Sequence, residues 1–137
     1  MSWNTRHSRH PLPGHTLTNI FPCSTMGQDA ILLDKTVWVY GGQTLSAFGT
    51  RQLYSLDLFA PFDTNSPPWT DHTPDGAEVA PMAAFLNLFP SADRKGFFAY
   101  QGGANPYNGT IPFALYNAST RSWTKPTSSG TAPLPRE

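Results

Sequence analysis

The residues best suited to chemistry in this chain are its four histidines, and three of them stand near the N-terminus. His7 and His10 have the i, i+3 spacing of some metal-ligand pairs, but no carboxylate or thiol stands close in the sequence to complete a site. His72 follows Asp71 in a short polar segment, where we expect a solvated surface. The histidines therefore predict no metal centre, and nothing else in the chain predicts a cofactor.

Nucleophilic and acid–base catalysis lack a recognisable arrangement as well. Serines are abundant, but none stands in the Gly-x-Ser-x-Gly turn that presents a hydrolase nucleophile, and any Ser-His-Asp combination would be an arbitrary choice. The glycine-rich stretch 102–110 lacks the Lys-Ser or Lys-Thr of a phosphate-binding loop. No spacing fixes two carboxylates on one face, and Asp57 is better explained as a residue that closes a strand. The chain is therefore predicted not to be an enzyme.

Composition and charge exclude further classes of protein. Nine basic and nine acidic residues give a net charge of zero, and neither sign forms a block, so we expect no nucleic-acid interface. No apolar run approaches the about 18 residues that cross a membrane, so we expect no direct membrane insertion. Cys23 is the only cysteine and is expected to be a buried structural thiol. The N-terminus lacks an apolar leader segment, so the chain read literally is cytosolic.

Two N-glycosylation sequons are present. They begin at Asn108, in Asn-Gly-Thr, and at Asn117, in Asn-Ala-Ser. Asn108 falls in an expected loop and is the better acceptor of the two. Both would be modified only if the chain passes through the secretory route.

The elements that must position these residues are short β-strands, because 14 prolines and 11 glycines punctuate the chain and Glu and Lys are scarce. The runs at 30–33 and 36–40 flank a two-residue turn, Asp34-Lys35, and predict a hairpin. Residues 51–58 alternate between apolar and polar side chains and predict a half-buried strand. Residues 69–73 predict a short polar outer strand.

A second series of four runs follows the first. We expect strands at 82–89, 96–100, 110–117 and 121–126. Pro112 cannot donate to a ladder, so we expect it at the start of its strand.

Each series carries two glycines after its second run and a tryptophan in its last. The double glycines, Gly41-Gly42 and Gly102-Gly103, lie 61 residues apart, and Trp69 and Trp123 lie 54 apart. Glycine tolerates positive φ and has no Cβ, so we expect crowded backbone at these places. A four-strand unit that recurs at about 50 residues is typical of a β-propeller blade.

The stretch "LYNASTRSW" resembles the end of the third strand in the kelch motif. Tyr116, Asn117 and Trp123 match the motif residue by residue, with Asn in place of the commoner Asp, and "VWVYGG" matches its hydrophobic strand and double glycine. The second unit departs from the motif by Gln101, inserted before its glycines, and the first has Leu56-Asp57 in the Tyr-Asp position. "SLDLFAPFDTNSPPW" is similar to the long-blade kelch ectodomains of fungal membrane-anchored proteins.

The resemblance implies an all-β fold: a partial β-propeller made of two four-stranded antiparallel kelch-type blades, with a ring that this chain alone does not close. We expect a polar arm at 1–22, a first blade at 23–80, and a second blade at 81–137 that leads into a further blade. Open blade faces would allow self-association.

The function implied is a non-catalytic binding module that presents loops to a protein or a glycan. The expected contact residues are Thr44, Phe48, Arg51, Asn105 and Tyr107. Phe48 and Tyr107 could instead plug their own blades.

Two alternatives stay open. The chain could be a purely structural piece of a longer secreted or membrane-anchored propeller, which would place it at the cell surface. It could also be the remnant of a copper oxidase similar to galactose oxidase. A single thiol and the lack of histidine in the second unit count against the oxidase.

Overall fold

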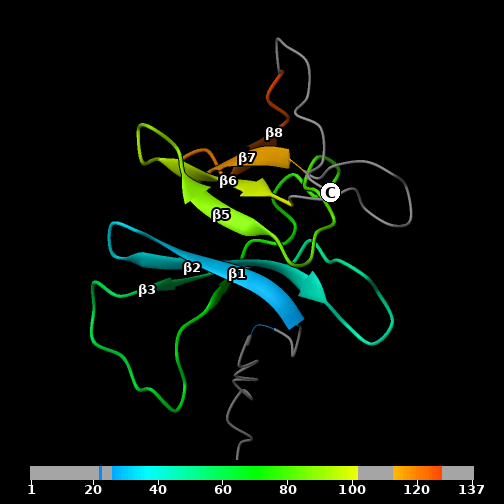
Figure 1. Ribbon diagram of the computed structural model, residues 1–137. Coiled ribbons are helices and arrows are strands. Elements are labelled where there is room, and N and C mark those ends of the chain that lie inside the picture. The colour runs from blue at the N-terminus through cyan, green and yellow to red at the C-terminus, as the bar shows by residue number, and fades with distance from the viewer. Residues whose placement is uncertain (1–21, 23–25, 102–112, 128–137) are drawn as a thin grey trace, which may run out of the picture.

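The computed structural model describes residues 22, 26–101 and 113–127, and this part of the chain is built from β-strands without a helix. The strands form two four-stranded antiparallel sheets, in which each strand pairs with its neighbours in the sequence (Figure 1). The sheets stay separate and do not close into a ring. The prediction of an all-β fold with two such sheets is confirmed for the described residues. The first sheet contains β1 (Met26–Leu33), β2 (Thr36–Gln43), β3 (Leu53–Asp57) and β4 (Thr70–Asp71), and the second contains β5 (Asn87–Pro90), β6 (Gly96–Tyr100), β7 (Phe113–Asn117) and β8 (Ser122–Thr124).

The first hairpin forms where the sequence predicts it. Leu33 pairs with Thr36, so Asp34 and Lys35 make a two-residue turn between β1 and β2. Asp34 has a φ of 52°, a left-handed conformation that Asp tolerates better than most residues. β1 is longer than the predicted run at 30–33.

Two strand predictions are wrong in extent or burial. The strand predicted at 82–89 is replaced by the short β5, because Phe85 has a φ of 53° and interrupts the extended backbone. Ala83, within that stretch, forms only an isolated bridge with Thr50. β3 was expected to be half-buried, but Ser55 on its polar side is only 8% exposed because the second sheet covers that side.

The two sheets pair their strands in matching registers, so residues of the first sheet have equivalents in the second. Five consecutive pairs join β2 to β3, starting at Thr36–Asp57, and five join β6 to β7, starting at Gly96–Asn117. Alternate residues of a strand point to opposite faces. We define the leading faces by Trp38, Tyr40, Leu53 and Ser55 in the first sheet and by their equivalents Phe98, Tyr100, Phe113 and Leu115 in the second. We define the trailing faces by Val37, Val39, Tyr54 and Leu56 in the first sheet and by Phe97, Ala99, Ala114 and Tyr116 in the second.

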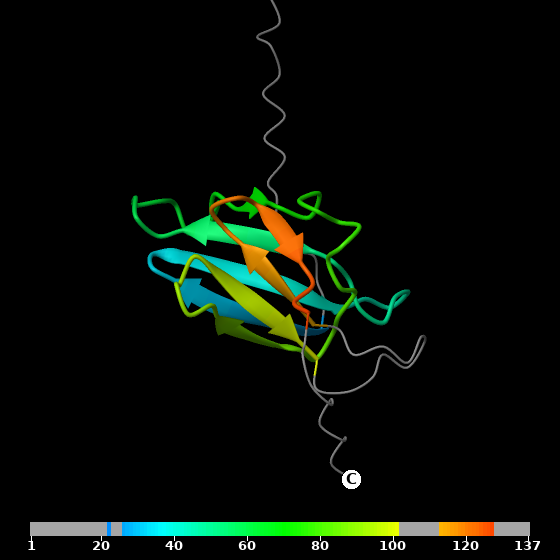
Figure 2. The same cartoon turned by 90° about the horizontal axis from the view of Figure 1, so that it is seen from above.

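The leading face of the first sheet packs against the trailing face of the second, which lies across it in Figures 1 and 2. The Trp38 ring lies 6.0 Å from Phe97 and 5.3 Å from Tyr116, measured between ring centroids. The Tyr40 ring lies 4.7 Å from that of Trp123. All five side chains are buried, and tilted ring pairs at such distances are favourable beyond their burial. The sheets therefore stack head to tail, each contributing a different face to the contact.

The chain between the two sheets crosses close to the double glycine of β2. Gly41 and Gly42 have φ values of 75° and 99°, and the N–H of Gly42 donates to the carbonyl of Ala83 at 2.9 Å. A Cβ on Gly41 would lie 2.5 Å from Leu86 Cδ2 and 2.7 Å from the Ala83 carbonyl oxygen. Both the backbone conformation and the close approach of the connection require glycine at position 41.

Trp123 is expected to be a major source of stability, because its ring packs on three aromatic side chains between the sheets. Trp123→Ala should lower the free energy of unfolding by about 3–5 kcal/mol, as large-to-small changes in cores do. Trp69→Ala, which removes a half-buried ring from the first sheet's outer edge, is the matched control and should have a clearly smaller effect. Denaturant titration measures both. Equal losses would mean that the inter-sheet core is not built as described.

Candidate functional site

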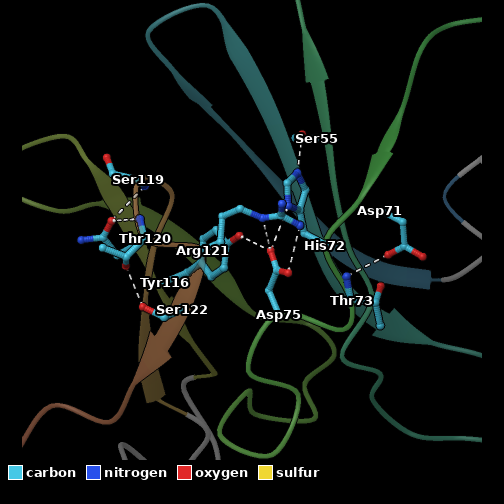
Figure 3. A network of polar contacts seen from close by, with 11 residues as sticks. Ser55, Asp71, His72, Thr73, Asp75, Tyr116, Ser119, Thr120, Arg121 and Ser122 are labelled. Carbon is cyan, nitrogen blue, oxygen red and sulfur yellow. Dashed lines mark hydrogen bonds and ion pairs between the residues drawn. The ribbon is translucent and has the colours of Figure 1, made fainter.

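A network of polar side chains lies at the edge of the contact between the two sheets (Figure 3). Its members come from both sheets and from the segment that connects them. They are Ser55 in β3, His72 just after β4, Asp75 in the following turn, Tyr116 in β7 and Arg121 just before β8. Polar groups from distant parts of the chain thus meet beside an aromatic core.

Ser55, His72 and Asp75 are joined in the order of a serine hydrolase triad. Ser55 Oγ lies 2.9 Å from His72 Nε2, and His72 Nδ1 lies 3.0 Å from Asp75 Oδ2. A carboxylate can only accept, so Nδ1 carries the proton that faces Asp75; in a neutral ring, Nε2 then accepts the Ser55 O–H. The prediction that His72 lies on a solvated surface is wrong, because it is 7% exposed and its ring lies 4.9 Å from Trp38.

Asp75 is the centre of the network. Besides His72, it accepts the Tyr116 hydroxyl at 3.1 Å and two hydrogen bonds from Arg121, at 2.9 Å to Oδ2 and 3.1 Å to Oδ1. Burial opposes ionisation of this carboxyl, but the hydrogen bonds from Arg121, His72 and Tyr116 and the charge of Arg121 together outweigh it, so the pKa of Asp75 is below its ordinary value. Burial and the hydrogen bond to Asp75 raise the pKa of Tyr116.

The surroundings of Ser55 do not fit acyl transfer. Ser55 is 8% exposed, and Trp38 covers the ring of its histidine partner. Ser55 also lies within the ladder, opposite Trp38 on one side and Thr70 on the other, rather than on a turn that aims backbone N–H groups at an oxyanion. This geometry joins the connecting segment to both sheets and leaves the Ser55 hydroxyl largely covered.

Three of the residues expected to bind a partner, Thr44, Phe48 and Arg51, lie in the described part of the chain. Each of them interacts with other residues of the same chain. Thr44 Oγ1 accepts the N–H of Ala47 at 3.1 Å and shapes a loop that encloses an open hollow of about 210 Å³. Arg51 Nε donates to a backbone carbonyl in the connecting segment at 2.7 Å. Phe48 is half-buried, with its ring 6.3 Å from that of Phe85. Sequence reasoning missed Leu45, which lies at the tip of the same loop and is fully exposed.

Other predicted residues are placed only in part. Asn117 ends β7, and its Oδ1 accepts the N–H groups of Ser119 at 2.9 Å and Thr120 at 3.0 Å. The arm at 1–22 lies outside the described residues except for Pro22. Also outside them are His7, His10, His15, Cys23, Gly102, Gly103, Asn105, Tyr107, Asn108 and Pro112.

Neither a metal-ion cluster in the described residues nor a known relative adds to this geometry. Within 26–101 and 113–127, no group of three or more His, Cys, Asp and Glu side chains is placed to hold a metal ion. The same stretches hold no helix with the length and apolar character needed to span a membrane. No protein-family model matches the chain, and no curated protein matches it.

The polar network was not predicted from the sequence, although part of its signal was present. His72 and Asp75 stand three residues apart in a turn-rich segment, which brings their side chains together locally. Ser55 joins them only through the pairing of β3 with β4, where it lies opposite Thr70. Arg121 joins only through the stacking of the sheets.

Asp75→Asn should destabilise the fold in a pH-dependent way. At pH 7 we expect a loss of about 1–3 kcal/mol in the free energy of unfolding, because hydrogen bonds to a charged group are lost. A carboxyl whose pKa is lower in the folded chain stabilises the fold above its unfolded pKa of about 4, and this contribution disappears as the pH falls through the folded value.

The difference between wild type and Asp75→Asn should therefore shrink below about pH 4. Denaturant titrations of both proteins at pH 7, 5 and 3 measure it. An unchanged difference across these three pH values would contradict the assignment of Asp75 as the ionised centre of the network.

Proposed function

We propose that this chain is a non-catalytic interaction module of the kelch type. Its two sheets would be neighbouring blades of a β-propeller, and the loops that follow the second strand of each blade would contact a protein or a glycan. The observation that carries the proposal is the head-to-tail stacking of two equivalent four-stranded meanders.

Head-to-tail stacking distinguishes repeated units from two halves of a sandwich. In a propeller, blades are related by rotation about a common axis, so the same face of each blade meets the opposite face of the next. A sandwich closed about a two-fold axis would instead bury equivalent faces against each other. Here Trp38 meets Phe97 and Tyr116, whereas the equivalent of Trp38 is Phe98. This agrees with the "VWVYGG" and "LYNASTRSW" motifs of the sequence.

The matching registers support a shared loop surface, because the pairing of β2 with β3 and that of β6 with β7 end at equivalent positions of the two sheets. The first loop joins β2 to β3, and the second joins β6 to β7 at the equivalent position. In the first loop Leu45 is fully exposed at the tip, whereas Phe48 packs near Phe85 and supports the loop from below. An exposed apolar side chain ringed by small polar groups, as Leu45 is by Thr44 and Ser46, is suited to anchor a partner.

The arrangement of Ser55, His72 and Asp75 favours one competing function, acyl transfer from a serine nucleophile. A fluorophosphonate probe, which labels activated serines, tests it. We expect no modification of Ser55 in the folded chain, because the hydroxyl is buried. Stoichiometric labelling at Ser55, with loss of labelling in His72→Ala, would replace the interaction module by a hydrolase.

The loop surface is tested by Leu45→Asp and, separately, by Tyr107→Ala. Protein partners are captured from an extract on the immobilised wild-type chain and identified by mass spectrometry. Glycan partners are identified by applying the labelled chain to a glycan array. Each variant should weaken capture of the same partner at least about tenfold, or about 1.4 kcal/mol. The Leu45 variant should keep the melting curve of the wild type, since that side chain contacts solvent.

Phe59→Asp is the matched control. Phe59 is 74% exposed, and it follows β3 at the opposite end of the first sheet. This variant should capture the partner as the wild type does. If Leu45→Asp and Phe59→Asp bind equally well, the loops are not the recognition surface, and the purely structural role becomes the better account.

A further inference from the structure

The leading face of the second sheet is an aromatic surface that the described part of the chain leaves open. Phe89 is 40% exposed and Phe113 is 37% exposed. Phe98, which is half-buried, stands between them, with ring centroids 5.5 Å from each. Tyr100 packs edge-on against Phe113 at 5.9 Å. An apolar sheet face of this kind predicts a contact with another surface.

The orientation of the rings indicates what kind of surface fits. The planes of Phe98 and Phe113 are within 8° of parallel, and these two residues belong to neighbouring strands. Rings stacked across strands about 4.8 Å apart stand upright on the sheet, with their faces against each other and their edges outward. Such a face interdigitates with side chains of another sheet and does not offer the flat platform on which a sugar ring stacks.

The equivalent face in the first sheet shows which sheet surface fits. Trp38 and Leu53, the equivalents of Phe98 and Phe113, are 6% and 0% exposed. They are covered by a trailing face, that of the second sheet. The leading face of the first sheet is thus covered by a trailing face, and this is the kind of surface that a leading face of this chain is seen to bind.

We propose that the leading face of the second sheet binds the trailing face of the first sheet of a second copy of this chain. That trailing face is apolar, and its accessible part lies along β1: Ala30 and Leu32 are exposed and Val37 is half-buried, whereas Val39, Tyr54 and Leu56 are buried. Leu32 pairs with Val37 and so lies on the same face. The contact between copies would use this accessible part along β1 and would repeat the order of faces seen between the two sheets of one copy. The inference rests on the stacking in the proposed function and is independent of the loops.

The symmetry of the assembly follows from which two faces meet. Because two different faces meet, the contact is heterologous and generates either a closed ring or an open chain of copies. Propellers close with about 4–8 blades, so a ring of two-blade chains would contain about two to four copies.

Sedimentation velocity over a concentration series tests the proposal with single variants. The wild type should associate beyond a dimer or form a ring. Phe113→Lys on the leading face and Leu32→Lys on the trailing face should each weaken association at least about tenfold, because each buries an unpaired charge in the contact. Phe59→Lys, which lies on neither face, should associate as the wild type does.

Mixing the two variants is the decisive arm. Each would keep one intact face, so a 1:1 mixture of Phe113→Lys and Leu32→Lys should form a dimer that grows no further. Circular dichroism confirms that each variant is folded; if one is not, Phe89→Lys and Ala30→Lys replace the pair on the same two faces.

Three outcomes would overturn the proposal. The wild type could remain monomeric at high concentration, which would show that the leading face of the second sheet does not bind a second copy. Leu32→Lys could associate as the wild type does while Phe113→Lys does not, which indicates that two leading faces meet. The mixture could remain monomeric. None of these outcomes changes the expected behaviour of Leu45→Asp towards a partner, so failure here is distinguishable from failure of the loop surface.

Discussion

The contact between the two sheets is the interaction on which the other features of this protein depend. Aromatic side chains dominate it, and each such ring removes roughly 150–250 Å² from water when buried. Trp38 and Tyr40 supply the rings of one sheet, and Phe97, Tyr116 and Trp123 those of the other. Neither four-stranded sheet could bury these side chains alone. The described fold therefore depends on the stacking of the sheets as well as on strand pairing within each sheet.

Asp75, at the edge of this contact, has its full set of hydrogen-bond donors only because the sheets are stacked. Asp75 belongs to the connecting segment, yet it accepts hydrogen bonds from Tyr116 and Arg121 of the second sheet. Through His72 it also reaches Ser55 of the first sheet. A half-buried carboxylate with its donors in place favours one arrangement of the surrounding elements, and the loss of a donor would weaken this preference. The same side chains that could form a catalytic triad on an exposed turn here join two sheets.

Local patterns in the sequence predicted most of the strands. The burial of individual side chains and the path of the connection between the sheets depend on tertiary packing, which these patterns do not encode. The Asp34-Lys35 hairpin followed from two adjacent apolar runs, because a hairpin is a local structure. The burial of Ser55 and His72 could not follow from alternation, since a second sheet covers them and nothing local encodes its position. Residues 82–86 resemble a strand in composition, but the connection must pass over Gly41, and that path bends the backbone at Phe85.

Aromatic nuclear Overhauser effects in solution test the head-to-tail stacking most directly. Head-to-tail stacking predicts cross-peaks between the ring protons of Trp38 and Tyr116 and between those of Tyr40 and Trp123, whose centroids lie 5.3 Å and 4.7 Å apart. These pairs join different sheets and are far apart in the sequence. Cross-peaks from Trp38 only to residues of its own sheet, or to Phe98 on the leading face of the second sheet, would contradict the stacking and with it the proposal that the two sheets are successive repeats.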